Sequence, residues 1–243
     1  MTNRYIHKDG RSLAWNKSKE LWEVYNTNGI VLSTHMDIFL DLFDHEEFEP
    51  FVLNNFSKFP WDFVEWEFYF VQLLDRSKSG GNNKTRCVKS YHIDSQKYLD
   101  KKMEEMITIA KATNSRIYVH PARRSKQKVA LELLSYIADT INTNTLDRVY
   151  RAFETATGRN TGTEKMWVLD FDSRDKNLLQ QHVEAIKLCK PYIDPEYILE
   201  TVSWYHVIYK GGFNRIEYNK FTNKEWLTMF DIHTNNPCLL YAY

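Results

Sequence analysis

The stretch from Met166 to Asp172 reads Met-Trp-Val-Leu-Asp-Phe-Asp, an apolar run that ends in two carboxylates one residue apart. The run predicts a buried β-strand, and alternate residues of a strand point to the same face. We therefore expect Asp170 and Asp172 to project together, with Phe171 turned away. Two carboxylates held that close repel each other unless a cation lies between them, and Mg²⁺ or Mn²⁺ suits oxygen ligands best. The alternative is a strand end that leads into a capping aspartate and an exposed loop.

The composition limits the classes of protein that the chain can belong to. Its 243 residues can bury a substantial core in one large domain or two small ones. The 32 basic and 32 acidic residues balance, so any surface that attracts nucleic acid must be local. Three widely separated cysteines argue against a zinc ribbon or a disulfide framework and favour a reducing, cytoplasmic location. The sequence has no signal-peptide pattern and no apolar run long enough for a membrane span, so we expect a soluble protein.

Residues 1–60 predict a helical N-terminal segment that packs on the main domain. Apolar residues recur at helix-like spacing between Val31 and Phe43, acidic residues follow, and Pro50 and Pro60 interrupt the pattern. We therefore expect the main α/β domain to cover residues 61–243.

Two strands joined by a glycine-rich turn open this domain. Residues 65–74 are aromatic and β-branched, residues 79–83 (Ser-Gly-Gly-Asn-Asn) signal a turn, and residues 86–93 resume the strand pattern. Basic residues gather near the turn: Arg76, Lys78, Lys84, Arg86 and Lys89. They could follow a nucleic-acid backbone, or they could protect an edge strand from aggregation.

A β-α-β unit follows between residues 87 and 120. Asp94 or Ser95 caps a helix that runs to about Thr113, and residues 116–120 form the next strand, so the two strands should be parallel in one sheet. A second helix begins at Ser125, directly after Arg123 and Arg124. Free N–H groups at a helix N-terminus attract phosphate, and arginines add bidentate donors, although a solvated turn would look the same.

Two further segments carry groups that could act with the aspartate pair. His206 lies in an apolar, β-rich stretch, where it is either a core histidine or a ligand for a phosphate oxygen beside a metal. Asp231, in Phe-Asp-Ile-His, could supply the third carboxylate that a two-metal site usually needs, and Glu200 and Glu217 compete for that role.

The order of these parts resembles the archaeo-eukaryotic primase superfamily, the catalytic domain of primases and primase–polymerases. Asp170 and Asp172 match its first motif, His206 is similar to the second, and Asp231 is the candidate for the third. The resemblance covers roughly residues 86–241. The family usually has a glycine before the motif-two histidine, whereas Ser203, Trp204 and Tyr205 stand here, and the spacing to Asp231 is short.

The resemblance implies an α+β (α/β) fold: an RRM-like primase core with a β-α-β module and a mixed sheet flanked by helices. It implies a stand-alone, metal-dependent nucleotidyltransferase, encoded by a phage or mobile element, that initiates or extends a strand from nucleoside triphosphates on a nucleic-acid template. A replication helicase could act with it in trans. Asp170, Asp172 and a third acid would hold Mg²⁺ or Mn²⁺, His206 and Arg123 or Arg124 would bind phosphate, and the basic hairpin would bind the template. The alternatives are a metal-dependent nuclease or phosphotransferase, or an inactive phage protein that binds nucleic acid or protein.

Overall fold

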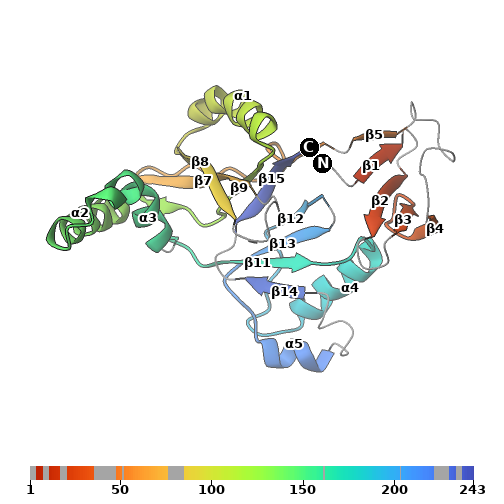
Figure 1. The fold of residues 1–243 in the computed structure, drawn as a ribbon. Helices are drawn as coiled ribbons and strands as arrows, with labels where there is room; N and C mark the ends of the chain where they lie inside the picture. The colour runs from red at the N-terminus through yellow and green to blue at the C-terminus, as the bar shows by residue number, and fades with distance from the viewer. Residues whose placement is uncertain are drawn as a thin grey trace.

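The computed structural model describes residues 4–7, 11–16, 21–35, 48–50, 52–75, 85–160, 162–202, 204–221, 230–233 and 237–243. Within these ranges the chain forms three sheets, in which all paired strands are antiparallel, and five α-helices (Figure 1). The α+β class expected from the sequence is confirmed at this level. None of the helices in the described ranges is long and apolar enough to cross a membrane.

The N-terminal region is a sheet, and the prediction of a helical segment is wrong for its described residues. Five strands pair in the order β4-β3-β2-β1-β5: β1 (Arg4–His7), β2 (Ser12–Asn16), β3 (Leu21–Tyr25), β4 (Val31–His35) and β5 (Phe48–Pro50). The start of the predicted helix, at Val31, belongs to β4 because its backbone pairs with β3, and residues 36–43 lie outside the described residues. Leu13 and Val24 form the small core of this N-terminal sheet.

A six-stranded sheet forms the centre of the molecule. Five of its strands follow the order β10-β7-β9-β15-β6. The sixth strand, β8, pairs with β7 on the edge opposite to β9. Its strands are β6 (Leu53–Asn54), β7 (Glu67–Asp75), β8 (Arg86–Ile93), β9 (Arg116–Val119), β10 (Arg124–Ser125) and β15 (Cys238–Ala242). Because β8 and β9 are both antiparallel to β7, they are parallel to each other, as the β-α-β prediction requires, with β7 between them.

Helices cover both faces of this central sheet (Figure 1). α1 (Gln96–Thr113) begins at the predicted cap Ser95, whose hydroxyl accepts the Tyr98 N–H, and its buried residues join the main core. On the other face lie α2 (Lys126–Asn142), the 3₁₀ turn η3 (Leu146–Arg151) and α3 (Ala152–Arg159). Val129 near the start of α2 is buried, whereas Ile141 near its end is 60% exposed.

The region after residue 165 has the element order β-α-β-β-α-β. The elements are β11 (Met166–Phe171), α4 (Lys176–Lys187), β12 (Tyr197–Glu200), β13 (Tyr205–Lys210), α5 (Arg215–Phe221) and β14 (Phe230–His233). The strands pair in the order β12-β13-β11-β14, and α4 and α5 cover one face, where Leu169, Phe171 and Tyr209 are buried. On the opposite face Val168 and Ile208 join the core of the central sheet, so this face lies between the two sheets.

Candidate active site between the two sheets

Three residues singled out from the sequence occupy one row of the four-stranded sheet. Asp170 on β11 is the cross-strand partner of His206 on β13 and of Asp231 on β14. Cross-strand partners share a face of a sheet, and the face that carries this row is the one not covered by α4 and α5. The register therefore brings together parts of the chain that are up to 61 residues apart.

The orientation of His206 is set by the last strand of the central sheet. The backbone N–H of Leu239 donates to Nδ1 of His206 at 3.3 Å, and the His206 side chain is 11% exposed. A neutral imidazole that accepts at Nδ1 carries its proton on Nε2. Nε2 lies 3.6 Å from Oδ1 of Asp170, whose side chain is 39% exposed. His206 therefore presents a proton beside an accessible carboxylate.

Asp170 and His206 line a cavity of about 330 Å³ between the sheets. Both sheets contribute to its wall, together with the turn between β12 and β13: Arg116, Tyr118, Val168, Asp170, Thr201, Val202, Trp204, His206, His233, Pro237 and Leu239. The cavity thus combines one accessible carboxylate, two imidazoles, a guanidinium and an indole ring.

Three residues of the cavity wall were not expected there from the sequence: Arg116, Trp204 and His233. His233 could have been found, because it lies two residues after Asp231 on the same strand and so shares its face. Arg116 has no such signal, since it reaches the cavity only because β9 lies beside β15.

Asp172 lies one residue beyond the end of β11, and its side chain is exposed. Strand alternation therefore does not set its direction, which depends on the loop that leads to α4. The side chain of Asp231 is not among those that the structure describes. Among the side chains that it does describe, no group of three or more His, Cys, Asp or Glu is arranged to hold a metal ion. A metal site at Asp170, Asp172 and Asp231 consequently stays a prediction.

Of the three candidates for the third acid, Asp231 has the best position. Leu199 is the cross-strand partner of His206, so its neighbour Glu200 lies on the opposite face. Glu217 belongs to α5, on the helix-covered side, where its Oε2 accepts the Lys190 N–H at 2.7 Å. Asp231 alone among the three shares the row of Asp170.

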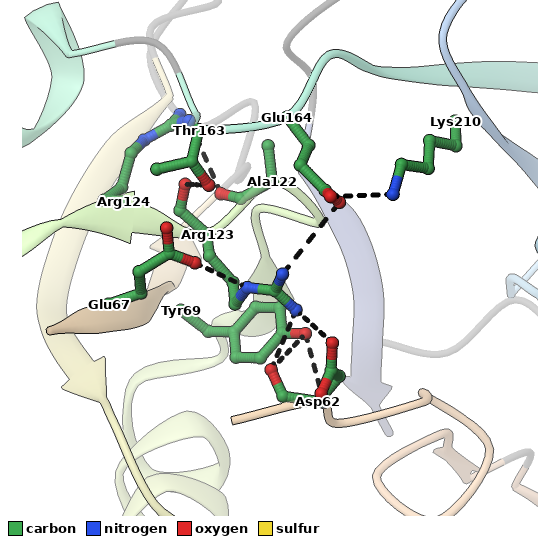
Figure 2. A network of polar contacts seen from close by, with 9 residues as sticks. All are labelled: Asp62, Glu67, Tyr69, Ala122, Arg123, Arg124, Thr163, Glu164 and Lys210. Atoms are coloured by element: carbon green, nitrogen blue, oxygen red, sulfur yellow. Dashed lines mark hydrogen bonds and ion pairs between the residues drawn. The ribbon is translucent and has the colours of Figure 1, made fainter. Parts of the chain in front are cut away.

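The structure places Arg123 in a network of carboxylates rather than in the cavity (Figure 2). Its Nε donates to Glu67 at 2.8 Å, its Nη1 donates to Asp62 at 2.6 Å, and Glu164 lies 4.0 Å from Nη2. Burial lowers the pKa of this guanidinium, but hydrogen bonds with Glu67, Tyr69 and Asp62 outweigh burial and raise the pKa overall. Because these acids already neutralise its charge, Arg123 is poorly suited to bind phosphate.

Arg124 is equally unsuited to bind phosphate from solution. It lies opposite Phe68 on β7, is 3% exposed, and donates from Nη1 to the Ala122 carbonyl at 3.4 Å. Burial lowers the pKa of its guanidinium. The predicted helix N-terminus is present, with Ser125 as the cap of α2, but the arginine beside it is enclosed.

The basic hairpin is described only in part. Arg76, Lys78 and Lys84 lie outside the described residues, while Arg86 begins β8 and is exposed. Lys89 pairs with Glu105 at 2.7 Å. The contact of this hairpin with a template stays a prediction.

Comparison with known proteins adds no relative to this picture. No protein-family model, no curated protein and no solved structure matches the chain. Function must therefore be inferred from the side chains that converge on the cavity.

Proposed function

We propose that the protein is a metal-dependent nucleotidyltransferase, similar to primases and primase–polymerases, that initiates or extends a nucleic-acid strand from nucleoside triphosphates. The observation that carries this proposal is the row of Asp231, Asp170 and His206 across three adjacent strands, on the face that lines the cavity. The three segments that resemble primase motifs therefore lie on adjacent strands, which supports the proposal.

The topology around this row supports an RRM-like core. The region has the element order β-α-β-β-α-β, with its helices on one face of the sheet. Numbered along the chain, its four strands are β11, β12, β13 and β14, and in the sheet they lie in the order four-one-three-two. RRM sheets use their helix-free face to contact nucleic acid. Here the corresponding face packs on the central sheet and carries the cavity. Asp170 and His206 lie on the two middle strands, β11 and β13.

The acidic residues suit a hard divalent cation, because carboxylate oxygens are the ligands that Mg²⁺ and Mn²⁺ prefer. Asp170, with Asp172 and Asp231, would hold the ions. Bound there, the ions would lower the pKa of an attacking 3′-hydroxyl and offset charge on the phosphates.

The other cavity residues have complementary roles in this proposal. His206 donates from Nε2 to a phosphate oxygen, since Leu239 occupies Nδ1. Arg116 takes the phosphate-binding role expected of Arg123 and Arg124, because it is the arginine that lines the cavity. Trp204, 36% exposed at the cavity wall, offers a ring on which a base can stack.

The direct test is strand synthesis. Wild-type protein receives a template, with and without a primer, and nucleoside triphosphates with Mn²⁺ or Mg²⁺, and we expect products longer than the primer or new short strands. Asp170→Asn should lower the rate by roughly 10²-fold or more, whereas Glu200→Gln, on the opposite face, should stay within about twofold. Shortened substrate would instead indicate the nuclease alternative, which uses the same carboxylates.

Metal binding is tested separately by calorimetric titration with Mn²⁺. We expect binding to wild type and its loss in Asp170→Ala/Asp172→Ala. Equal heats for the two proteins would contradict every metal-dependent activity at this site and leave the non-enzymatic alternative, a module that binds nucleic acid or protein.

A further inference from the structure

The loop after β11 connects the site to the N-terminal sheet. Two residues beyond Asp172, the side chain of Arg174 leaves the loop and reaches this sheet, where it is 8% exposed. Its Nη1 donates to Oγ of Ser12 at 3.3 Å, and its guanidinium lies 4.4 Å from the centre of the Tyr25 ring. Ser12 and Tyr25 are cross-strand partners on β2 and β3, so Arg174 contacts one pair on one face.

A second set of contacts holds the backbone of the same loop. Gly29, in the turn between β3 and β4, has φ +81, and a Cβ at this position would lie 1.8 Å from the carbonyl oxygen of Arg174. The Lys176 N–H donates to the Asn28 carbonyl at 3.4 Å. The turn and the loop are therefore in direct backbone contact, beside the start of α4 (Figure 1).

The environment of Arg174 suits an arginine. Glu23 lies two residues before Tyr25 on β3, is 1% exposed, and accepts a hydrogen bond from the Tyr25 hydroxyl. A buried guanidinium is stabilised by stacking on an aromatic face and by oppositely charged or hydrogen-bonding neighbours. Leucine at position 25 would remove the ring, and glutamine at position 174 would remove the charge.

We propose that Arg174 is a positioning residue: it ties the loop that carries Asp172 to the N-terminal sheet and thereby determines how tightly the site binds its divalent cation. The inference rests on the proposed function, because it gives Asp172 a role in metal binding. β11 ends at Phe171, so the loop decides where the Asp172 carboxylate points. Arg174 limits that choice, since only Ser173 separates the two residues.

The test compares Arg174→Gln and Tyr25→Leu with Tyr25→Phe, which retains the ring, and with Arg159→Gln, which removes an exposed arginine on α3. Calorimetry with Mn²⁺ and the Mn²⁺ dependence of strand synthesis are measured for each protein. We expect Arg174→Gln and Tyr25→Leu to weaken Mn²⁺ binding by roughly 10-fold, because losing a residue that supports a metal ligand has an effect of this size. At saturating Mn²⁺, kcat should stay within about twofold of wild type. Tyr25→Phe and Arg159→Gln should bind Mn²⁺ as wild type does.

Hydrogen exchange supplies a readout that does not depend on activity. Faster exchange confined to residues 172–178 in Arg174→Gln, with weaker Mn²⁺ binding, would support the positioning role. Unchanged exchange or unchanged Mn²⁺ affinity would overturn it, as would absence of Mn²⁺ binding in wild type. If wild type binds Mn²⁺ but synthesises no strand, the proposed function fails while the positioning role is still decided by exchange and calorimetry.

Discussion

The two ends of β11 are attached to different sheets by different kinds of contact. Two residues before the strand, Glu164 lies between Lys210, at 2.7 Å, and Arg123, which directly precedes β10 of the central sheet, at 4.0 Å (Figure 2). Three residues after the strand, Arg174 packs on Tyr25 and Ser12 of the N-terminal sheet. The strand that carries Asp170 is thus held by arginines at both ends.

The difference lies in what surrounds each arginine. Arg123 is held by carboxylates, one of which, Asp62, is 73% exposed, so its contacts are ionic and partly open to water. Arg174 is held by a ring, a hydroxyl and close backbone packing. Exposed ionic contacts weaken with salt, whereas buried contacts are screened much less. The contacts at the start of β11 should therefore weaken as ionic strength rises, whereas those at its end should be sensitive to changes in side-chain shape.

The largest loss of stability is expected where the turn at Gly29 packs against the loop after β11. Gly29→Ala should lower the free energy of unfolding by about 3 kcal/mol, because the added Cβ meets the Arg174 carbonyl in a backbone conformation that alanine rarely adopts. Gly211→Ala is the matched control: its φ is +82, but a Cβ there meets nothing within 4 Å, so we expect about 1 kcal/mol. Urea denaturation measures both, and equal losses would show that the contact with Arg174 contributes nothing.

The ionic contact at the start should be weaker and sensitive to salt. Arg123→Met leaves Glu67 and Asp62 without their cation, and we expect a loss of about 2 kcal/mol at low salt. At about 1 M salt, where the Debye length is only ~3 Å, roughly half of this loss should disappear. The loss in Arg174→Gln should change less with salt, because Arg174 is buried and buried charges are screened much less than exposed ones. Parallel salt dependence of the two variants would erase the distinction between the ends.

Mild acid should weaken the end of β11 more than its start. His182 on α4 is fully buried against Phe171, its Nδ1 lies 2.6 Å from the Tyr218 hydroxyl, and burial lowers its pKa to about 4. Because the unfolded chain binds this proton near pH 6.5, the stability from neutral His182 is complete above that pH and declines as pH falls toward 4. We expect a loss on the order of 1 kcal/mol between pH 7 and pH 5.

The double variant His182→Leu/Tyr218→Phe removes both hydrogen-bonding partners and should reduce this acid loss. His92, whose pKa burial also lowers to about 4, acts with the same sign elsewhere, so part of the loss should remain. Denaturation at pH 7 and pH 5 measures the difference. An unchanged acid loss in the double variant would assign it to other groups.

The smallest effect is expected at Lys210. Its pair with Glu164 is exposed on both sides, and hydrogen bonding to Glu164 raises the pKa of its ammonium. Exposed pairs contribute little, so Lys210→Ala should leave the unfolding midpoint within experimental error. A clear loss would mean that the network holds the start of β11 through Lys210 as well as Arg123.

Local patterns predicted much of the fold. The strand at Met166, the helix that begins after Ser95 and the hairpin before it depend on neighbouring residues, and all three are present. The N-terminal sheet was missed because the spacing of apolar residues after Val31 imitates a helix, while the pairing with β3 that makes β4 a strand is not local.

The candidate site likewise depends on contacts between distant parts of the chain, which local sequence patterns do not predict. The order of motifs suggested that Asp170, His206 and Asp231 belong together, but only the strand register aligns them. Arg123 was assigned to phosphate because its acidic partners come from residues 62, 67 and 164, which no local pattern connects. Arg116 was missed for the converse reason, since its neighbour β15 comes more than 120 residues later.

The position of β15 has a consequence for how the protein acquires its site during synthesis. β15 fills the central sheet between β9 and β6, and its Leu239 amide orients His206. A growing chain that stops before residue 238 therefore lacks both the strand and the donor, even though Asp170 and His206 have already been made. Until residues 238–242 emerge from the ribosome, the nascent protein should hold an open sheet and an unoriented imidazole, so the site is complete only once β15 has paired with β9 and β6.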